Sequence, residues 1–387
     1  MSEWKETTLS DVVSILGDGL HGTPQYDNDG EYYFINGSNL SNGKIIIKEN
    51  TKRTSVDEYN KYKKDLNDRT ILISINGTLG NIAVYNNENC ILGKSVCYFN
   101  VINTVDKRFI RYVVLDKQFQ NYINIYAHGT TIKNVSLDTM REYQFLLPPF
   151  PEQKAIASVL SSLDDKIDLL HRQNKTLEAM AETLFRQWFV EEADEGWEER
   201  PLDQIADYLN GLACQKYPPK NEVDKLPVLK IKELRNGFTD KSDWASTDIP
   251  DEYIVQNGDV IFSWSGSLMV KIWDGADCVL NQHLFKVTSE HYPKWFYYLW
   301  TKYHMNKFVS IAEGKATTMG HIKRGDLSNS PVVIPESNEL EDIDIIISPL
   351  IDKVIINNQQ IRKLEVLRDL LLSKLMSGEV RLEYEDN

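Results

Sequence analysis

Residues 151–188 read PEQKAIASVLSSLDDKIDLLHRQNKTLEAMAETLFRQW, and their apolar side chains recur alternately four and three positions apart. This spacing is typical of a coiled coil, in which the apolar side chains of a long helix form one narrow seam. A stripe this narrow is buried only against another helix, so the segment predicts a helical partner. The predicted seam positions of this first helix are Leu160, Leu163, Ile167, Leu170, Asn174, Leu177 and Leu184.

A second seam follows near the C-terminus, at Leu350, Val354, Asn357, Ile361, Leu364 and Leu371. Each seam contains an interior asparagine, which commonly fixes the register of a coiled coil at some cost in stability. Two helices of about 35–40 residues would each span roughly 50–60 Å, and we expect them to pair with each other in antiparallel orientation. The alternative is two core helices in separate domains, although such helices usually have a broader apolar face.

The chain is a tandem duplication, because matches near the end of each half fall at one offset of 187 residues. A repeat of this kind decides the domain organisation before any single motif does. The matched positions include Thr130-Thr131 with Thr317-Thr318, Pro148 with Pro335, Asp165-Lys166-Ile167 with Asp352-Lys353-Val354, and, at slightly larger offsets, Ile71–Ser74 with Val260–Ser263 and Trp4 with Trp197. Each copy is therefore expected to hold a globular part (1–150 and 196–335) followed by a helical part (151–195 and 336–387).

The globular parts read as mixed α/β, with a twisted β-sheet and helices. Short runs rich in β-branched residues end at turn signals, for example Ile71–Ile75 before Asn76-Gly77. A helix is expected after the strand at 96–101, and its aromatic side chains could stack on bases or lie in the core. A helical stripe of this kind is more often core, so we assign to the core Phe109, Tyr112, Val113, Phe119 and their counterparts Phe296, Leu299 and Trp300.

Taken as a whole-chain value, the net charge of −14 argues against nucleic acid as a ligand, because phosphate binding requires Lys and Arg. Counting Lys and Arg against Asp and Glu leaves 1–150 at −1 and 196–335 at −2, whereas 151–195 carries −5 and 336–387 carries −6. The excess acid thus falls in the helical segments. The two globular parts are nearly balanced, so composition permits nucleic-acid binding there.

The sequence predicts a cytoplasmic protein. No apolar run approaches the roughly 18 residues that cross a bilayer, and the N-terminal residues lack the apolar core of a signal peptide. The four cysteines, Cys90, Cys97, Cys214 and Cys278, are scattered and form no CxxC pair, which favours a reducing compartment.

The residues that a catalytic centre would need are missing from the sequence. An adenine methyltransferase clamps the flipped base with (Asp/Asn)-Pro-Pro-(Tyr/Phe), and the nearest match, Leu147-Pro148-Pro149-Phe150, begins with a side chain that cannot hydrogen-bond. Gly93-Lys94-Ser95 resembles the end of a phosphate loop, but Glu88 stands where the first glycine is required. The seven histidines show no metal-binding spacing. We predict no catalytic residue, no metal and no cofactor bound by this chain.

The run Pro148-Pro149-Phe150-Pro151-Glu152-Gln153-Lys154-Ala155-Ile156 resembles the Pro-Pro-x-x-Glu-Gln-x-x-Ile junction of type I restriction-modification specificity subunits. The turn Gly22-Thr23-Pro24, the segment Gly129-Thr130-Thr131 and the duplication itself agree with that family, so the resemblance covers nearly the whole chain. The second copy departs from the pattern, since it reads Val333-Ile334-Pro335-Glu336-Ser337 without a second proline or a Glu-Gln pair.

The resemblance implies two target recognition domains, each reading one half of a split, asymmetric DNA sequence, with the helices as a spacer between them. It also implies two methyltransferase subunits that use S-adenosylmethionine to methylate adenine, and restriction subunits that add ATP- and Mg²⁺-dependent translocation and cleavage. A rigid spacer would place the half-sites about one helical turn apart, roughly 34 Å. No membrane partner is expected.

Polar and basic side chains in the predicted turns are the candidates for DNA contact, since such groups read base edges and bind phosphates. In the first copy they are His21, Thr23, Gln25, Tyr26, Asn76, Thr78, Lys94, Ser95, His128, Thr130, Thr131 and Lys133. In the second copy they are Lys216, Tyr217, Ser265, Ser267, Gln282, His283, Lys315, Thr317, Thr318, His321, Lys323 and Arg324. The two Thr-Thr loops, retained in both copies, are the strongest candidates, although helix capping would also retain them.

Two other functions compete with DNA reading. A coiled-coil scaffold, or a silent or regulatory specificity cassette, would have the same repeat and helices without DNA binding. A self-contained enzyme is disfavoured by the missing base clamp and cofactor turn.

Overall fold

The computed structural model describes residues 4–129, 131–314 and 320–382, which form two compact units. Unit 1 comprises residues 1–166 and 364–387, and unit 2 comprises residues 167–363. Each unit joins one predicted globular part to portions of both predicted helical parts. Within the described residues, none of the helices combines the length and the apolar character that a membrane span requires.

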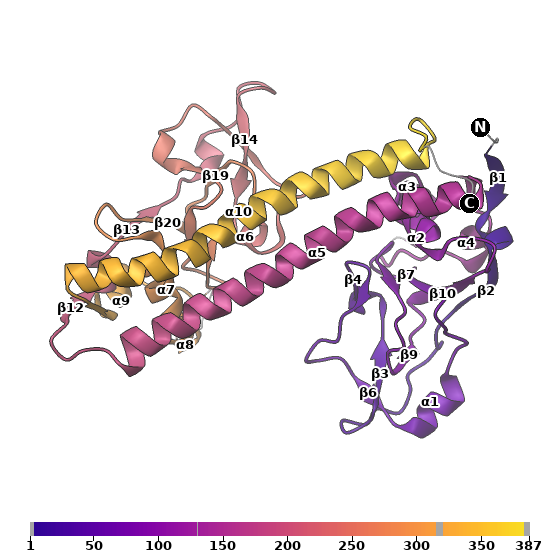
Figure 1. Ribbon diagram of the computed structural model, residues 1–387, viewed down its shortest axis with the longest axis horizontal. Helices are drawn as coiled ribbons and strands as arrows, with labels where there is room; N and C mark the ends of the chain where they lie inside the picture. The colour runs from indigo at the N-terminus through magenta and orange to yellow at the C-terminus, as the bar shows by residue number, and fades with distance from the viewer. Residues whose placement is uncertain (1–3, 130, 315–319, 383–387) are drawn as a thin grey trace. The chain divides into compact units, whose positions relative to one another are not determined.

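Unit 1 is built on an antiparallel four-stranded sheet of order β2-β10-β7-β8, of which Figure 1 labels β2, β10 and β7. The strands are β2 (Val13–Asp18), β7 (Thr70–Ser74), β8 (Ile82–Val84) and β10 (Val96–Val101). Every residue of β7 and β10 is buried because both faces of the sheet are covered. Ile71, Ile73 and Phe99 pack with helices α2 (Lys107–Leu115) and α3 (Lys117–Ile125), whereas Leu72 and Tyr98 face the other way.

The second face is covered by a smaller sheet of order β6-β3-β9, comprising β3 (Tyr32–Ile35), β6 (Arg53–Thr54) and β9 (Cys90–Leu92). The remaining elements are β4 (Leu40–Ser41), β5 (Lys44–Ile45), α1 (Val56–Tyr62), α4 (Leu137–Arg141) and the antiparallel pair of β1 (Lys5–Thr8) with β11 (Gln144–Leu147). Phe109, Tyr112, Val113 and Phe119 are at most 2% exposed, so their assignment to the core is confirmed.

Unit 2 repeats this plan. Its main sheet has the order β13-β20-β17-β18, with strands β13 (Asp207–Asn210), β17 (Val260–Ser263), β18 (Met269–Ile272) and β20 (Leu284–Thr288). Helices α7 (Lys294–Tyr303) and α8 (Met305–Gly314) pack on it, and Phe296, Leu299 and Trp300 are buried as predicted. The other elements are β12 (Glu198–Pro201) paired with β21 (Pro331–Ile334), α6 (Ile231–Asn236), α9 (Arg324–Ser328) and a sheet of order β15-β14-β19-β16, formed by Trp244–Ser246, Lys225–Leu229, Cys278–Leu280 and Ile254–Val255. The predicted mixed α/β tandem repeat is confirmed.

The two long helices are α5 (Phe150–Arg186) and α10 (Ser337–Met376). In unit 1, Arg368 Nη1 of α10 donates to Asp164 Oδ1 of α5 at 3.2 Å. In unit 2, Asn357 Nδ2 donates to Asn174 Oδ1 at 2.8 Å, so the two predicted polar seam residues bind each other. Unit 1 holds the start of α5 with the end of α10, and unit 2 holds the end of α5 with the start of α10, which confirms the predicted antiparallel pairing.

The predicted seam residues all lie at buried or half-buried positions of these helices. Buried are Leu160, Ile167, Leu170, Asn174, Val354, Asn357 and Ile361, and half-buried are Leu163, Leu177, Leu184, Leu350, Leu364 and Leu371. α5 ends close to the predicted boundary, in a π-helical turn at Gln187–Glu191. Gly378, with φ of 73°, follows the end of α10, and glycine adopts this left-handed conformation without the steric cost of a side chain.

The junction motif of the first copy is a polar clamp. Gln153 is 2% exposed, its Oε1 accepts from the Asp106 backbone N–H at 2.9 Å, and its Nε2 donates to the Pro148 carbonyl at 2.8 Å. Asp106 in turn caps α2 by accepting from the Arg108 backbone N–H at 2.8 Å. Gln153 therefore ties the start of α5 to the start of α2.

Replacing Gln153 by leucine is expected to lower the free energy of unfolding by about 1–3 kcal/mol, because a buried N–H and a buried carbonyl lose their partners. The measurement is urea unfolding followed by circular dichroism. Gln144→Leu, at an exposed position of β11, is the matched control and should change stability by less than about 0.5 kcal/mol. Equal effects of the two substitutions would contradict the clamp.

Candidate nucleic-acid interface

One end of the main sheet in unit 1 gathers four loops. Residue 18 at the end of β2 faces residue 97, and residue 74 at the end of β7 faces residue 96, so β2 and β7 end where β10 begins. The first three loops at this edge are 19–26, 75–81 and 93–95, and the fourth is described at 127–129 and 131–135. They are joined by backbone hydrogen bonds from Gly19 N to Val96 O (3.1 Å), Ile75 N to Ser95 O (2.9 Å), Gly77 N to Lys133 O (2.9 Å) and Val135 N to Ile75 O (2.8 Å).

We call this set of backbone hydrogen bonds between loops the loop frame. Unit 2 has the same frame at the same edge of its sheet. The corresponding bonds run from Gly211 N to Leu284 O (3.1 Å), Gly266 N to Gly320 O (2.9 Å) and Ile322 N to Trp264 O (3.1 Å). Gly19 and Gly211 are required for close approach, since a Cβ would lie 2.3 Å from the Gly93 carbonyl oxygen in one copy and 2.4 Å from that of Asn281 in the other. The frame is thus a duplicated feature that holds polar loops at one end of each unit.

Most of the predicted contact residues of the first copy lie on these loops. Exposed are His21, Thr23, Gln25, Tyr26, Thr78, Lys94, His128, Thr131 and Lys133, and half-buried are Asn76 and Ser95; Thr130 lies outside the described residues. Ser95 Oγ accepts from the Gly37 N–H at 2.9 Å and hydrogen-bonds Asn36 Oδ1 at 3.1 Å, so its hydroxyl serves the loop structure. Gln25 and Tyr26 lie beside the smaller sheet, where Tyr26 pairs with Thr54.

The frame of unit 1 presents amide side chains. Asn76 Nδ2 donates to Asn134 Oδ1 at 3.0 Å between two loops, and Asn134 is exposed. The ammonium groups of Lys94 and Lys133 lie on neighbouring exposed loops. His21 is paired with Asp18 at the end of β2. Asn134 was not predicted, although it follows Lys133 directly and an asparagine beside a polar turn is a common DNA-contacting residue.

In unit 2, the predicted residues His283, His321, Lys323 and Arg324 are exposed on the frame, Gln282 and Ser267 are half-buried, and Ser265 is buried. Ser265 Oγ lies 3.4 Å from His283 Nδ1. Arg324 Nη2 donates to the Tyr208 carbonyl at 3.2 Å. Lys216 and Tyr217 adjoin the second sheet, where the Tyr217 carbonyl accepts from Ser246 N, and Lys315, Thr317 and Thr318 lie outside the described residues.

Trp264 is the residue that the sequence reasoning missed. It follows β17, is half-buried, and its indole N–H donates to Asn210 Oδ1 at 3.1 Å. Its ring centre lies 6.0 Å from that of His283 and 6.2 Å from that of His321. Trp264 directly follows an apolar strand run and lies outside the turn residues chosen as candidates, but it occupies the place of Ile75 in the duplicated frame, which was the available signal. The same frame therefore presents amides in unit 1 and aromatic rings in unit 2.

The described residues contain no group of three or more His, Cys, Asp or Glu side chains placed to hold a metal ion. The exposed groups at both frames are instead hydrogen-bond donors, acceptors and cations. This set suits recognition of a polar, anionic surface.

The type I restriction modification DNA specificity family has a sequence model that matches residues 1–179 and 194–366, one match for each frame. The chain belongs to this family. It is 26% identical to the type I restriction enzyme MjaIX specificity subunit of Methanocaldococcus jannaschii, covering 98% of this chain and 94% of the relative. It is 20% identical to the type I restriction enzyme HindI specificity subunit of Haemophilus influenzae, covering 98% and 100%.

The fold of this specificity subunit is similar to that of the type I restriction-modification S subunit from M. genitalium, with a TM-score of 0.56, 18% identity and 96% of each chain covered. The resemblance of its junction motif to the family is therefore confirmed. The second copy of this specificity subunit lacks the second proline and the Glu-Gln pair, as the sequence indicates, but it retains the glutamate. Glu339 stands at the 187-residue offset from Glu152, and Trp197 Nε1 donates to Glu339 Oε2 at 2.8 Å as Trp4 Nε1 donates to Glu152 Oε2 at 3.1 Å. Glu336 replaces the second proline of the motif and Leu340 replaces the glutamine.

Proposed function

We propose that this specificity subunit reads a split, asymmetric DNA sequence, with one half-site bound by each loop frame. The observation that carries the proposal is the duplicated backbone frame with different side chains on its two copies. Base edges in the major groove present distinct patterns of donors, acceptors and methyl groups, so different side chains select different bases. Two unlike frames in one chain therefore favour two unlike half-sites.

The side chains of the two frames favour different bases in the two half-sites. Asparagine amides pair with adenine in the major groove, so Asn76 and Asn134 favour an adenine in the first half-site. Apolar and aromatic surfaces contact the thymine methyl group, so Trp264 favours thymine in the second half-site. Lys94, Lys133 and Lys323 are exposed cations suited to the phosphates beside the bases.

The long helices are proposed to set the gap between the half-sites. α5 and α10 contain 37 and 40 residues and each contributes to both units. A helix pair held in register by Asn174 and Asn357 resists the slippage that would change the gap. We expect half-sites separated by about one helical turn of DNA, roughly 34 Å.

Methyltransferase subunits are the proposed partners of the long helices, and the exposed apolar side chains there support a protein partner. Lys175, Ala179, Met180 and Leu184 line a shallow groove of about 510 Å³ on α5. At the repeat offset, Met180 corresponds to Leu367 and Leu169 to Ile356, and all four are exposed. Two equivalent apolar surfaces favour two copies of one partner. We propose that the methyltransferase subunits supply S-adenosylmethionine chemistry on adenine and that restriction subunits use ATP and Mg²⁺, with no cofactor bound by this chain.

Footprinting of the reconstituted methyltransferase complex on DNA tests the proposal. Two protected segments separated by an unread gap are expected, together with methylation of an adenine in that sequence. A complex that assembles but protects no split site would contradict DNA reading and favour a scaffold or a silent cassette.

Asn76→Ala is expected to relax the base preference in one half-site, with a loss of about 1–3 kcal/mol of discrimination at a single base pair. The measurement is methylome sequencing of cells that express the complex with each variant. Asn103→Ala is the matched control, because Asn103 is exposed beyond the opposite end of β10.

Trp264→Ala should have the reciprocal effect, relaxing the other half-site and leaving the first unchanged. A substitution that alters both half-sites equally would contradict independent reading by the two frames.

A further inference from the structure

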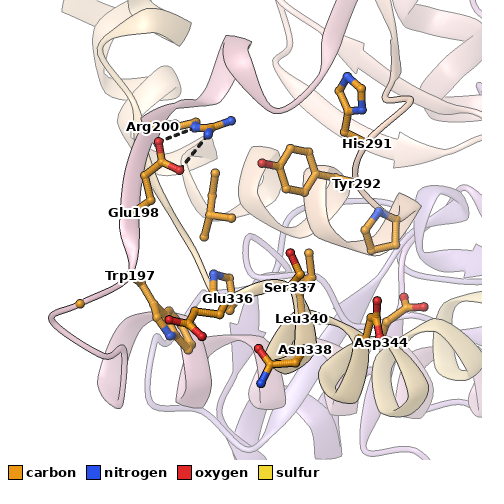
Figure 2. Close-up of a pocket in the computed structure, with 15 residues that line it drawn as sticks. Trp197, Glu198, Arg200, His291, Tyr292, Glu336, Ser337, Asn338, Leu340 and Asp344 are labelled. Carbon is orange, nitrogen blue, oxygen red and sulfur yellow. Dashed lines mark hydrogen bonds and ion pairs between the residues drawn. The ribbon is translucent and has the colours of Figure 1, made fainter.

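A cavity of about 1000 Å³ lies in unit 2, at the start of α10 and away from the residues of the loop frame (Figure 2). Its apolar lining includes Trp197, Tyr292 and Leu340, and Figure 2 shows the Tyr292 ring directed into the space. Glu198, Glu336, Glu341 and Asp344 supply carboxylates, whereas the Arg200 guanidinium is held by Glu198 through two hydrogen bonds of 2.8 Å. The cavity therefore combines an apolar floor with a surplus of negative charge.

At the corresponding place in unit 1, the three residues of the polar clamp are buried. There Gln153 links the Asp106 backbone N–H to the Pro148 carbonyl. The equivalents of these three residues in unit 2 are Leu340, Pro293 and Pro335, and all three line the cavity. Leucine cannot form these hydrogen bonds, and proline at position 293 has no N–H to donate. The second copy therefore lacks the clamp, and a cavity lies in its place.

Beside the clamp, unit 1 holds an arginine. The Arg381 guanidinium donates through Nε to Glu152 Oε1 at 2.5 Å and through Nη2 to Oε2 at 2.7 Å. The Arg381 Cζ atom lies 5.1 Å from the centre of the Trp4 ring, and the indole N–H of Trp4 also donates to Glu152. The Trp4–Glu152 pair thus receives an arginine by a bidentate ion pair and a cation–π contact.

Unit 2 has an equivalent tryptophan–glutamate pair, Trp197 and Glu339, but none of the arginines that the structure describes is bound to it. We call this pair the arginine receptor of each unit. The indole N–H of Trp197 donates to Glu339 Oε2, as in the first copy. The position corresponding to Arg381 at the repeat offset is Asp194, whose carboxylate accepts from the Gly196 N–H at 2.7 Å. Glu339 is exposed, and no cation among the described residues of the chain pairs with it.

We propose that Trp197, Glu339 and the adjoining cavity form a docking site for an arginine-bearing segment of a partner protein. The guanidinium binds the Glu339 carboxylate against the Trp197 ring, and apolar residues next to the arginine enter the cavity. The occupant is identified by the arginine that the duplicated receptor holds in unit 1 and by the negative charge of the cavity. The proposal does not depend on DNA reading.

The test uses the full-length chain and a fluorescein-labelled peptide of residues 376–382, MSGEVRL, which is the segment that reaches the receptor in unit 1. The chain's own tail retains the Trp4–Glu152 site, because an attached segment has an effective concentration near the millimolar range. Binding followed by fluorescence anisotropy therefore reports on unit 2. A peptide in which alanine replaces Arg381 should bind about tenfold more weakly or worse.

Glu339→Gln in the protein should weaken binding of the arginine peptide by a similar factor of about ten. Asp342→Asn, which removes a charge from an exposed residue of α10 outside the cavity lining, is the matched control and should leave most of the affinity. Thermal unfolding of both variants checks that each is folded. Equal binding of the two peptides, equal effects of the two carboxylate-to-amide substitutions, or no arginine-dependent binding would each overturn the proposal. A failed DNA footprint would not affect any of these results.

Discussion

Arg381→Ala is expected to lower the free energy of unfolding of unit 1 by about 3–5 kcal/mol. The reason is the burial of Glu152, which is 0% exposed and receives both guanidinium hydrogen bonds of Arg381. Removing the arginine leaves a buried carboxylate with the Trp4 indole as its remaining donor. Because an ion cut off from water and from its counter-ion is costly, the effect should exceed that of removing a surface ion pair.

Urea unfolding followed by circular dichroism measures this effect, with separate transitions allowed for the two units. Lys61→Ala is the matched control within unit 1, because Lys61 is 63% exposed and pairs with Glu58 in α1. Its loss should cost at most about 1 kcal/mol. The double variant Glu152→Gln, Arg381→Ala should recover part of the stability, since a neutral amide replaces the unpaired charge. Similar losses for Arg381→Ala and Lys61→Ala would show that the tail is not part of the folded unit.

The helices and the repeat could be predicted from the sequence because their signals are local and periodic. The four-and-three spacing in 151–188 indicates which face of α5 is buried. The repeat offset of 187 residues locates a second helix with the same spacing, which is the expected partner of that face. Asn174 and Asn357 interrupt otherwise apolar seams, and two polar groups at equivalent depth are most readily satisfied by each other. The observed hydrogen bond between them follows from this requirement.

The loop frames could be predicted only in part. Turn residues can be recognised locally, but the bond from Gly77 to Lys133 joins positions far apart in the sequence, and no periodicity specifies it. Trp264 was missed because it directly follows the apolar run Val260–Ser263, and an aromatic residue in that position is usually part of the core. Glu339 was missed because the motif was sought as a contiguous Glu-Gln pair, whereas the duplication preserves the position of the glutamate and not its neighbour.

Deleting one heptad from each long helix is expected to shorten the unread gap by about three base pairs while both half-sites stay the same. The segments are residues 167–173 of α5 and 359–365 of α10, which lie opposite each other in the antiparallel register. Each helix loses roughly 10 Å, at about 1.5 Å per residue, and a base-pair step occupies about 3.4 Å. The deletion retains the Asp164–Arg368 and Asn174–Asn357 contacts on either side, so the seam can close in its original register.

Methylome sequencing of cells that express the complex with the paired deletion measures the gap directly. The matched control removes 167–173 from α5 alone, which places Asn174 opposite apolar seam positions and should abolish methylation through loss of helix pairing. Circular dichroism and thermal unfolding of the paired deletion check that both units remain folded. An unchanged gap in a folded, methylating complex would mean that the helices do not set the spacing. The half-sites would then be held apart by the partner subunits, and the register set by the two asparagines would serve stability alone.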